Sequence, residues 1–146
     1  MKEGIIKLFL RLSISFSFLS AVADRLGLLD AKYSVWGTWD NFLDYTKLIN
    51  PWFPDRFIGL VAMVATGCEI IFALCLIIGL RTALFAKLSG ALLLTFALSM
   101  TLSTGIKGAF DYSVFTASAA AFALSILKTK FLEIDSVLNV RSHFIK

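Results

Sequence analysis

The stretch FIGLVAMVATGCEIIFALCLIIG, residues 57–79, carries a single charged side chain, Glu69, near the middle of an apolar run. A run of about 20 mainly apolar residues is long enough for an α-helix to cross the hydrocarbon core of a bilayer. Small and polar residues recur at helical spacing along one face of this helix: Gly59, Ala62, Thr66, Glu69 and Ala73. Because small residues let helices approach closely in lipid, we expect this face, and Glu69 with it, to pack against neighbouring helices.

Three more apolar segments flank this one, at residues 5–23, 82–104 and 112–128. Only Gly79, Leu80 and Arg81 separate the second segment from the third, so these two helices are predicted to form an antiparallel hairpin. The sequence therefore predicts an all-α fold, a polytopic membrane four-helix bundle, as one domain over residues 1–146.

The overall composition agrees with this class. Hydrophobic residues make up 58% of the chain and charged residues 16%, against roughly 45–50% and about 25% in soluble domains. The net charge of +4 comes from basic residues at the ends of apolar segments, which is typical of membrane topology and not of nucleic-acid binding. Cys68 and Cys75 lie about two turns apart on one helix, too far for a disulfide, and the only histidine is His143. No metal site or cofactor built from the chain's own residues is expected.

The longest link, residues 24–56, is rich in aromatic side chains. Within it, Thr38 can cap a short helix that is predicted over residues 38–49 and that Asn50 and Pro51 end. An amphipathic helix carrying Trp and Tyr is typical of the headgroup level of a membrane. We expect this helix to lie flat over the outer mouth of the bundle.

Lysine and arginine counts predict the orientation. With the N-terminus in the cytoplasm, the inner side holds eight basic residues: Lys2, Lys7, Arg81, Lys87, Lys128, Lys130, Arg141 and Lys146. The outer side then holds five: Arg25, Lys32, Lys47, Arg56 and Lys107. The bias places both termini, and a tail at residues 129–146, on the cytoplasmic side of a bacterial inner membrane. A secretory signal ending at Ala21-Val22-Ala23 is the alternative interpretation of the first segment.

Two ionisable residues are predicted at membrane depth. Glu69 lies about 18 Å from the outer end of its helix and Arg11 about 9 Å from the inner end of the first, so in a core of about 30 Å their depths nearly match. An unpaired charge there costs at least about 2.5–3.5 kcal/mol. We therefore expect Arg11 and Glu69 to form an ion pair. In the alternative, Arg11 extends to the inner headgroups and Glu69 is protonated and bonded to a hydroxyl.

A second polar cluster is predicted where the first, third and fourth helices reach the outer surface. It comprises Asp24, Arg25, Lys107, Asp111 and Tyr112, beneath the aromatic residues Trp36 and Trp39. Such a cluster could form the mouth for a small ligand or a quinone headgroup. Ordinary anchoring at the membrane interface is the alternative.

These features together resemble the DoxX-like family of small four-helix membrane proteins, over about residues 5–128. The resemblance is carried by Leu10-Arg11-Leu12 through Phe18-Leu19-Ser20 with Arg25 at the helix end, by Gly67-Cys68-Glu69 through Leu74 and Leu76 to Gly79-Leu80-Arg81-Thr82, and by the stretch from Gly105 to Ser118. Members of this family include a quinone-linked subunit of a thiosulfate-oxidising complex, proteins of oxidative-stress and amine-utilisation systems, and a relative that assists receptor assembly in animals.

The resemblance implies an accessory subunit of a quinone-linked redox system, docked to a membrane or soluble oxidoreductase. Autonomous enzymatic activity is not expected, since the sequence offers no ligand set for haem, flavin or metal and no dithiol. One alternative is an assembly or chaperone-like protein whose helix faces bind partner helices. Another is a small solute or proton transporter, which with four helices would require homo-oligomerisation.

Overall fold

The computed structural model describes residues 2–136, and the regular secondary structure in this part of the chain is all helix, without strands. Its helices are α1 (Lys2–Arg25), α2 (Trp39–Ile49), α3 (Asp55–Ile78), α4 (Thr82–Thr104), α5 (Ile106–Asp111) and α6 (Val114–Ile126). Three of them, α1, α3 and α4, are long and apolar enough to cross a membrane. The length and composition of these three helices indicate a membrane protein.

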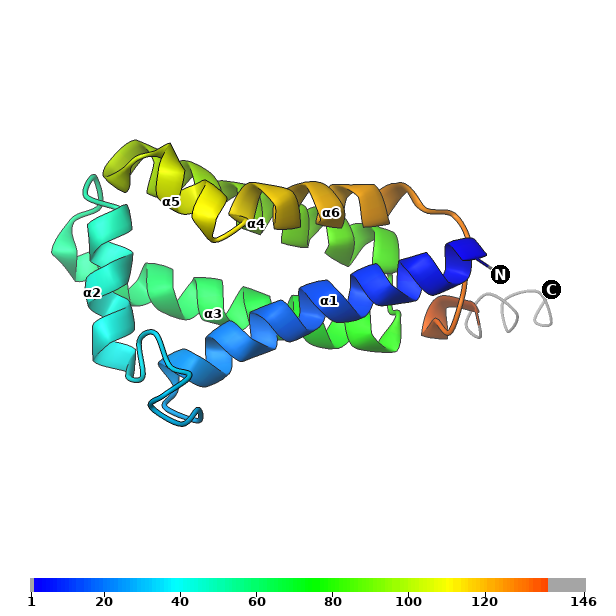
Figure 1. Ribbon diagram of the computed structural model, residues 1–146, viewed down its shortest axis with the longest axis horizontal. Helices are drawn as coiled ribbons and strands as arrows, with labels where there is room; N and C mark the ends of the chain where they lie inside the picture. Colours follow the sequence, from blue (N-terminus) through cyan, green and yellow to red (C-terminus); the bar gives the residue numbers. More distant parts are fainter. Residues whose placement is uncertain (1, 137–146) are drawn as a thin grey trace.

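The long helices form two layers (Figure 1). α1 packs on α3 in one layer, and α4 packs on α6 in the other. α2 runs across one end of the bundle, which we call the α2 end. The opposite end, which we call the turn end, holds the start of α1, the turn between α3 and α4, and the segment that follows α6.

The predicted helices at 38–49 and 82–104 are confirmed almost to the residue. α2 begins at Trp39 because Thr38 caps it, its Oγ1 accepting a hydrogen bond from the Asn41 amide at 3.3 Å. α1 is longer than the predicted 5–23 at both ends. α3 begins two residues before the predicted segment 57–79 begins, and it ends one residue before that segment ends. Arg25 is therefore helical, which places its side chain inside the bundle.

The fourth apolar segment differs from its prediction at 112–128. α4 ends at Gly105, whose φ of 96° lies outside the range that other residues adopt readily, and α5 follows where a loop was expected. Ser113, with φ of 55°, then separates α5 from α6. The result is a helix of 13 residues, about 20 Å long, running beside α4.

The predicted hairpin is confirmed at the turn between α3 and α4. Gly79 adopts the left-handed conformation, with φ of 71°, and Leu80 donates to the Cys75 carbonyl at 2.9 Å, which closes the last turn of α3. The glycine also makes room for a crossing segment, because a Cβ there would lie 2.6 Å from Glu133 Cα. The turn is thus packed against residues from far along the chain.

The predicted packing face of the second segment is also confirmed. Ala62, Thr66, Glu69 and Ala73 are all buried, and Gly59 is half-buried.

Two apolar clusters lie along the bundle. The one nearer the turn end comprises Ile14, Phe18, Ala73, Leu76, Ala86, Ala121 and Leu124, and the one nearer the α2 end comprises Ile49, Ala97, Met100 and Ala109. Glu69 therefore sits among packed helices and not against lipid.

Candidate functional site

A buried ion pair joins α1 and α3 beneath α2. Arg25 Nη1 lies 2.7 Å from Glu69 Oε2, and the two residues are only 2% and 3% exposed. Nη1 also donates a hydrogen bond to Thr66 Oγ1 at 2.8 Å, and Arg25 Nε donates to the Ala21 carbonyl at 3.0 Å. The Glu69 carboxylate is thus held by a close, charge-assisted contact with a guanidinium that is buried beside it.

Aromatic side chains cover the other face of this guanidinium. The Arg25 Cζ lies 4.0 Å from the centre of the Phe42 ring and 5.5 Å from that of Trp36. Trp36 meets Phe42 edge-on with ring centres 5.3 Å apart, and Trp39 packs on Phe42 at 5.5 Å. Cation–π attraction of this kind stabilises a desolvated cation by about 2 kcal/mol. The aromatic segment that was predicted to lie over the outer mouth of the bundle therefore contacts the buried arginine directly.

Asp24 holds the loop that carries Trp36. Its carboxylate accepts hydrogen bonds from the backbone amides of Val35 at 2.9 Å, Trp36 at 3.2 Å and Gly37 at 3.1 Å, and also from the Ser34 hydroxyl. Two adjacent residues of α1 therefore have different structural roles. Asp24 orders the loop, while Arg25 binds the core beneath it.

The predicted pairing of Arg11 with Glu69 is wrong. Arg11 is fully buried, and it donates to four backbone carbonyls near the turn end: Leu76 at 2.8 Å, Ile77 at 2.8 Å, Phe131 at 2.9 Å and Leu132 at 3.0 Å. The nearest carboxylate oxygen is Glu133 Oε1, 3.8 Å from Nη1. Two of the carbonyls belong to the last turn of α3, where a cation complements the helix dipole.

The direction of side chains on helices explains this difference. A side chain leans toward the N-terminus of its helix. α1 begins at the turn end and α3 at the α2 end, so Arg11 leans away from Glu69 while Arg25 leans towards it. The prediction compared only the depths of the Arg11 and Glu69 backbone positions. It did not include the displacement of the guanidinium along the helix axis, which the long arginine side chain makes large.

The turn end holds a second group of buried charges. Lys7 Nζ lies 2.8 Å from Glu133 Oε1 and donates to the Thr129 carbonyl at 2.7 Å. Asp135 accepts from the amides of Arg81 at 2.8 Å and Thr82 at 3.1 Å, which caps the start of α4. Residues 129–136 of the predicted tail are therefore bound to the bundle, and residues 137–146, with His143, lie outside the described residues. The sequence contains no periodic signal for these contacts.

The predicted mouth cluster is divided between two places. Asp24, Arg25, Trp36 and Trp39 meet beneath and within the α2 cover, as described above. Lys107 and Asp111 instead pair with each other on the surface of α5, at 2.6 Å and with side chains 85% and 58% exposed. Tyr112 is exposed. Burial raises the pKa of the Tyr45 phenol, and Tyr112 raises it further.

The remaining reactive side chains are dispersed. Cys68 and Cys75 are free thiols, both half-buried. Residues 2–136 contain no group of three or more His, Cys, Asp or Glu side chains placed to hold a metal ion. Within this part of the chain, the Arg25–Glu69 pair with its aromatic cover is the candidate functional site.

No family model matches the chain, and neither the curated proteins nor the solved structures contain a match to it. Membership of the DoxX-like family therefore stays a prediction from the residues quoted above. The class that the fold supports is broader: an all-helical protein with three candidate membrane-spanning helices and buried charges at both ends of its bundle.

Proposed function

We propose that the chain is an accessory subunit of a quinone-linked membrane redox system, and that the Arg25–Glu69 pair receives the quinone headgroup. The observation that carries the proposal is the Arg25–Glu69 pair itself, a guanidinium and a carboxylate buried together beneath aromatic rings. A quinone carbonyl accepts hydrogen bonds, a quinol hydroxyl donates them, and the ring between these groups is flat and apolar. An arginine, a carboxylate and an indole in contact match those three features. The DoxX-like resemblance supports the same assignment.

Quinone titration tests this proposal. Trp36 packs against the site, so a short-chain quinone bound there should quench tryptophan fluorescence of the purified protein in nanodiscs until the site is filled. We expect Arg25→Gln and Glu69→Gln to weaken this saturable quenching about tenfold or more, the loss typical of a charge-assisted hydrogen bond. Lys107→Gln is the matched control, because that lysine is paired on the surface. Quenching that never saturates, or that Glu69→Gln leaves unchanged, contradicts the proposal.

The proposed topology places four crossings in a bacterial inner membrane, with both termini in the cytoplasm. The excess of basic residues at the turn end supports this orientation. α6 is apolar and about 20 Å long, shorter than the roughly 30 Å hydrocarbon core, so the fourth crossing would require local thinning of the bilayer. Single cysteines introduced at Lys32 and Lys128 in a variant lacking Cys68 and Cys75 should react with an impermeant maleimide from opposite sides. Labelling from the same side would exclude this topology.

One observation favours a second function, assembly with a partner helix. Ser13, Ser17 and Ser20 lie exposed along one face of α1, where lipid would otherwise meet hydroxyl groups. The Ser17 hydroxyl donates to the Ser13 carbonyl at 2.8 Å, which satisfies it locally. Replacing the three serines by leucine should release a stoichiometric membrane partner if this face binds one, while leaving quinone quenching intact.

A further inference from the structure

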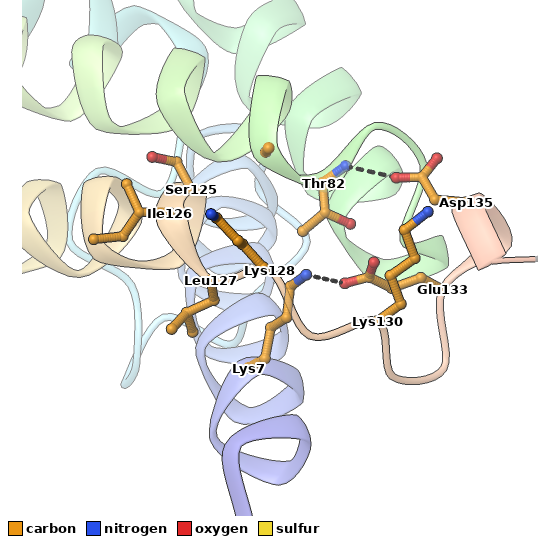
Figure 2. A pocket seen from close by; sticks show the side chains of 10 residues that line it. Lys7, Thr82, Ser125, Ile126, Leu127, Lys128, Lys130, Glu133 and Asp135 are labelled. Carbon is orange, nitrogen blue, oxygen red and sulfur yellow. Dashed lines mark hydrogen bonds and ion pairs between the residues drawn. The ribbon is translucent and has the colours of Figure 1, made fainter. Parts of the chain in front are cut away.

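A cavity of about 410 Å³ opens at the turn end, between the start of α1, the start of α4, the end of α6 and residues 127–135 (Figure 2). Its lining combines three lysines, Lys7, Lys128 and Lys130, with two carboxylates, Glu133 and Asp135. This cavity lies at the opposite end of the bundle from the Arg25–Glu69 pair. It plays no part in the proposed function.

The carboxylates of this cavity are already engaged. Glu133 pairs with Lys7 at 2.8 Å, and Asp135 accepts the amides of Arg81 and Thr82. Lys128 and Lys130 are exposed and make no hydrogen bond or ion pair with any residue in 2–136. Two positive charges at the cavity are thus left without a partner among the described residues, which favours an anion.

A buried hydroxyl on the cavity lining points to the same kind of ligand. Thr82 is 2% exposed, and its Oγ1 has no hydrogen-bond partner among the described residues. Buried polar atoms are nearly always bonded, so an orphan hydroxyl beside an open cavity indicates a missing acceptor. The backbone amide of Thr82 is occupied by Asp135, so the hydroxyl proton is the donor that Thr82 still offers.

The apolar side chains beside the cavity favour a lipid over a soluble anion as the ligand. Ile126 and Leu127 form part of the lining, and Ile126 is 73% exposed at the end of α6. An acyl chain can continue from the cavity along these side chains, while a free anion would gain nothing from them. Basic pockets between transmembrane helices on the cytoplasmic side bind anionic lipid headgroups, and the proposed topology puts the turn end on that side.

We propose that this cavity binds the phosphate of an anionic phospholipid headgroup, with Lys128 and Lys130 as the cationic contacts and Thr82 as a neutral donor. The lipid would join α4, α6 and the segment after α6. This site is independent of the proposed quinone site, so either proposal can fail without the other.

Native mass spectrometry of the full chain in a neutral detergent tests the site. Phosphatidylglycerol, phosphatidylcholine and soluble glycerol phosphate are titrated separately. We expect the wild type to retain phosphatidylglycerol in preference to both others. Lys128→Gln with Lys130→Gln should lower that affinity about 100-fold, since a charge-assisted hydrogen bond contributes about tenfold or more. Thr82→Val should lower it by a smaller factor with the Asp135 cap intact.

Lys87→Gln is the matched control, because this exposed lysine lies on α4 near the same end but outside the cavity lining. A loss in Lys87→Gln equal to that in Lys128→Gln alone or Lys130→Gln alone, each of which removes one charge, means that net charge alone attracts the lipid, which overturns the site. Equal binding of phosphatidylcholine and phosphatidylglycerol overturns it as well. Binding of glycerol phosphate as tight as that of the lipid overturns the lipid assignment in favour of a soluble anion.

Discussion

The two ends of the bundle bury an arginine from the same helix in different ways. At the α2 end, Arg25 faces a carboxylate, a threonine hydroxyl and two aromatic rings. At the turn end, Arg11 is surrounded by four backbone carbonyls. One arginine depends on the charge of a single side chain, whereas the other depends on the path of the backbone. A ligand that alters Glu69 can therefore change the contacts of Arg25, while the contacts of Arg11 with the four carbonyls change only if the backbone moves.

The largest effect should come from breaking the Arg25–Glu69 pair. Glu69→Leu leaves a buried guanidinium without its counter-charge, and we expect a loss of about 3–5 kcal/mol in unfolding free energy. Arg25→Met should restore most of that loss in the double variant, because no buried charge then remains. Reversible unfolding in mixed micelles measures both. Arg11→Met combined with Glu69→Leu should be additive, and strong coupling there would reinstate the pairing that the structure contradicts.

Arg11→Met should have the next largest effect, about 2–3 kcal/mol, because it removes several charge-assisted hydrogen bonds but strands no charge. The freed carbonyls of Phe131 and Leu132 lie near the surface, where water can replace the guanidinium. Unfolding free energy and trypsin cleavage after Lys128 and Lys130 report this change together. If stability falls while cleavage stays at the wild-type rate, Arg11 does not hold the segment after α6.

Gly79→Ala should destabilise the turn end by about 2 kcal/mol. The left-handed conformation costs an alanine about 1–2 kcal/mol, and the new Cβ would meet Glu133 Cα at 2.6 Å. Gly59→Ala is the control, because nothing lies within 4 Å of a Cβ at that position in α3. That control should unfold at the same or slightly higher denaturant. A stable Gly79→Ala protein would mean that residues 129–136 pack elsewhere.

The smallest effect should come from the exposed pair on α5. Lys107 and Asp111 approach to 2.6 Å, closer than the buried pair at 2.7 Å, yet solvent screens their attraction. Lys107→Ala should leave the unfolding midpoint unchanged within error in the same assay. A measurable loss would show that burial does not determine how much these ion pairs contribute to the free energy of unfolding.

The sequence predicts regular elements better than the partners of long side chains. Residues 82–104 and Thr38 carry local signals, apolar length and a cap, and both predictions are confirmed. Periodicity reports the face of a helix, so the prediction that Glu69 faces other helices is confirmed. Periodicity does not report how far a side chain leans along the axis, so its partner was predicted wrongly. Glu133 and Asp135 follow the last apolar segment without any repeating pattern, and their contacts arise only from the folded path.

The contacts of Arg11 have a consequence for how the chain is made. Its guanidinium binds a carbonyl 120 residues later in the sequence, close to the end of the described chain. At about 5–20 residues per second, a ribosome would need roughly 6–24 s to deliver that partner. α1 leaves the ribosome before the other described helices, yet it is among the last of them to complete its polar contacts. During that interval the guanidinium needs other hydrogen-bond acceptors, from an insertion factor or from water at the membrane surface.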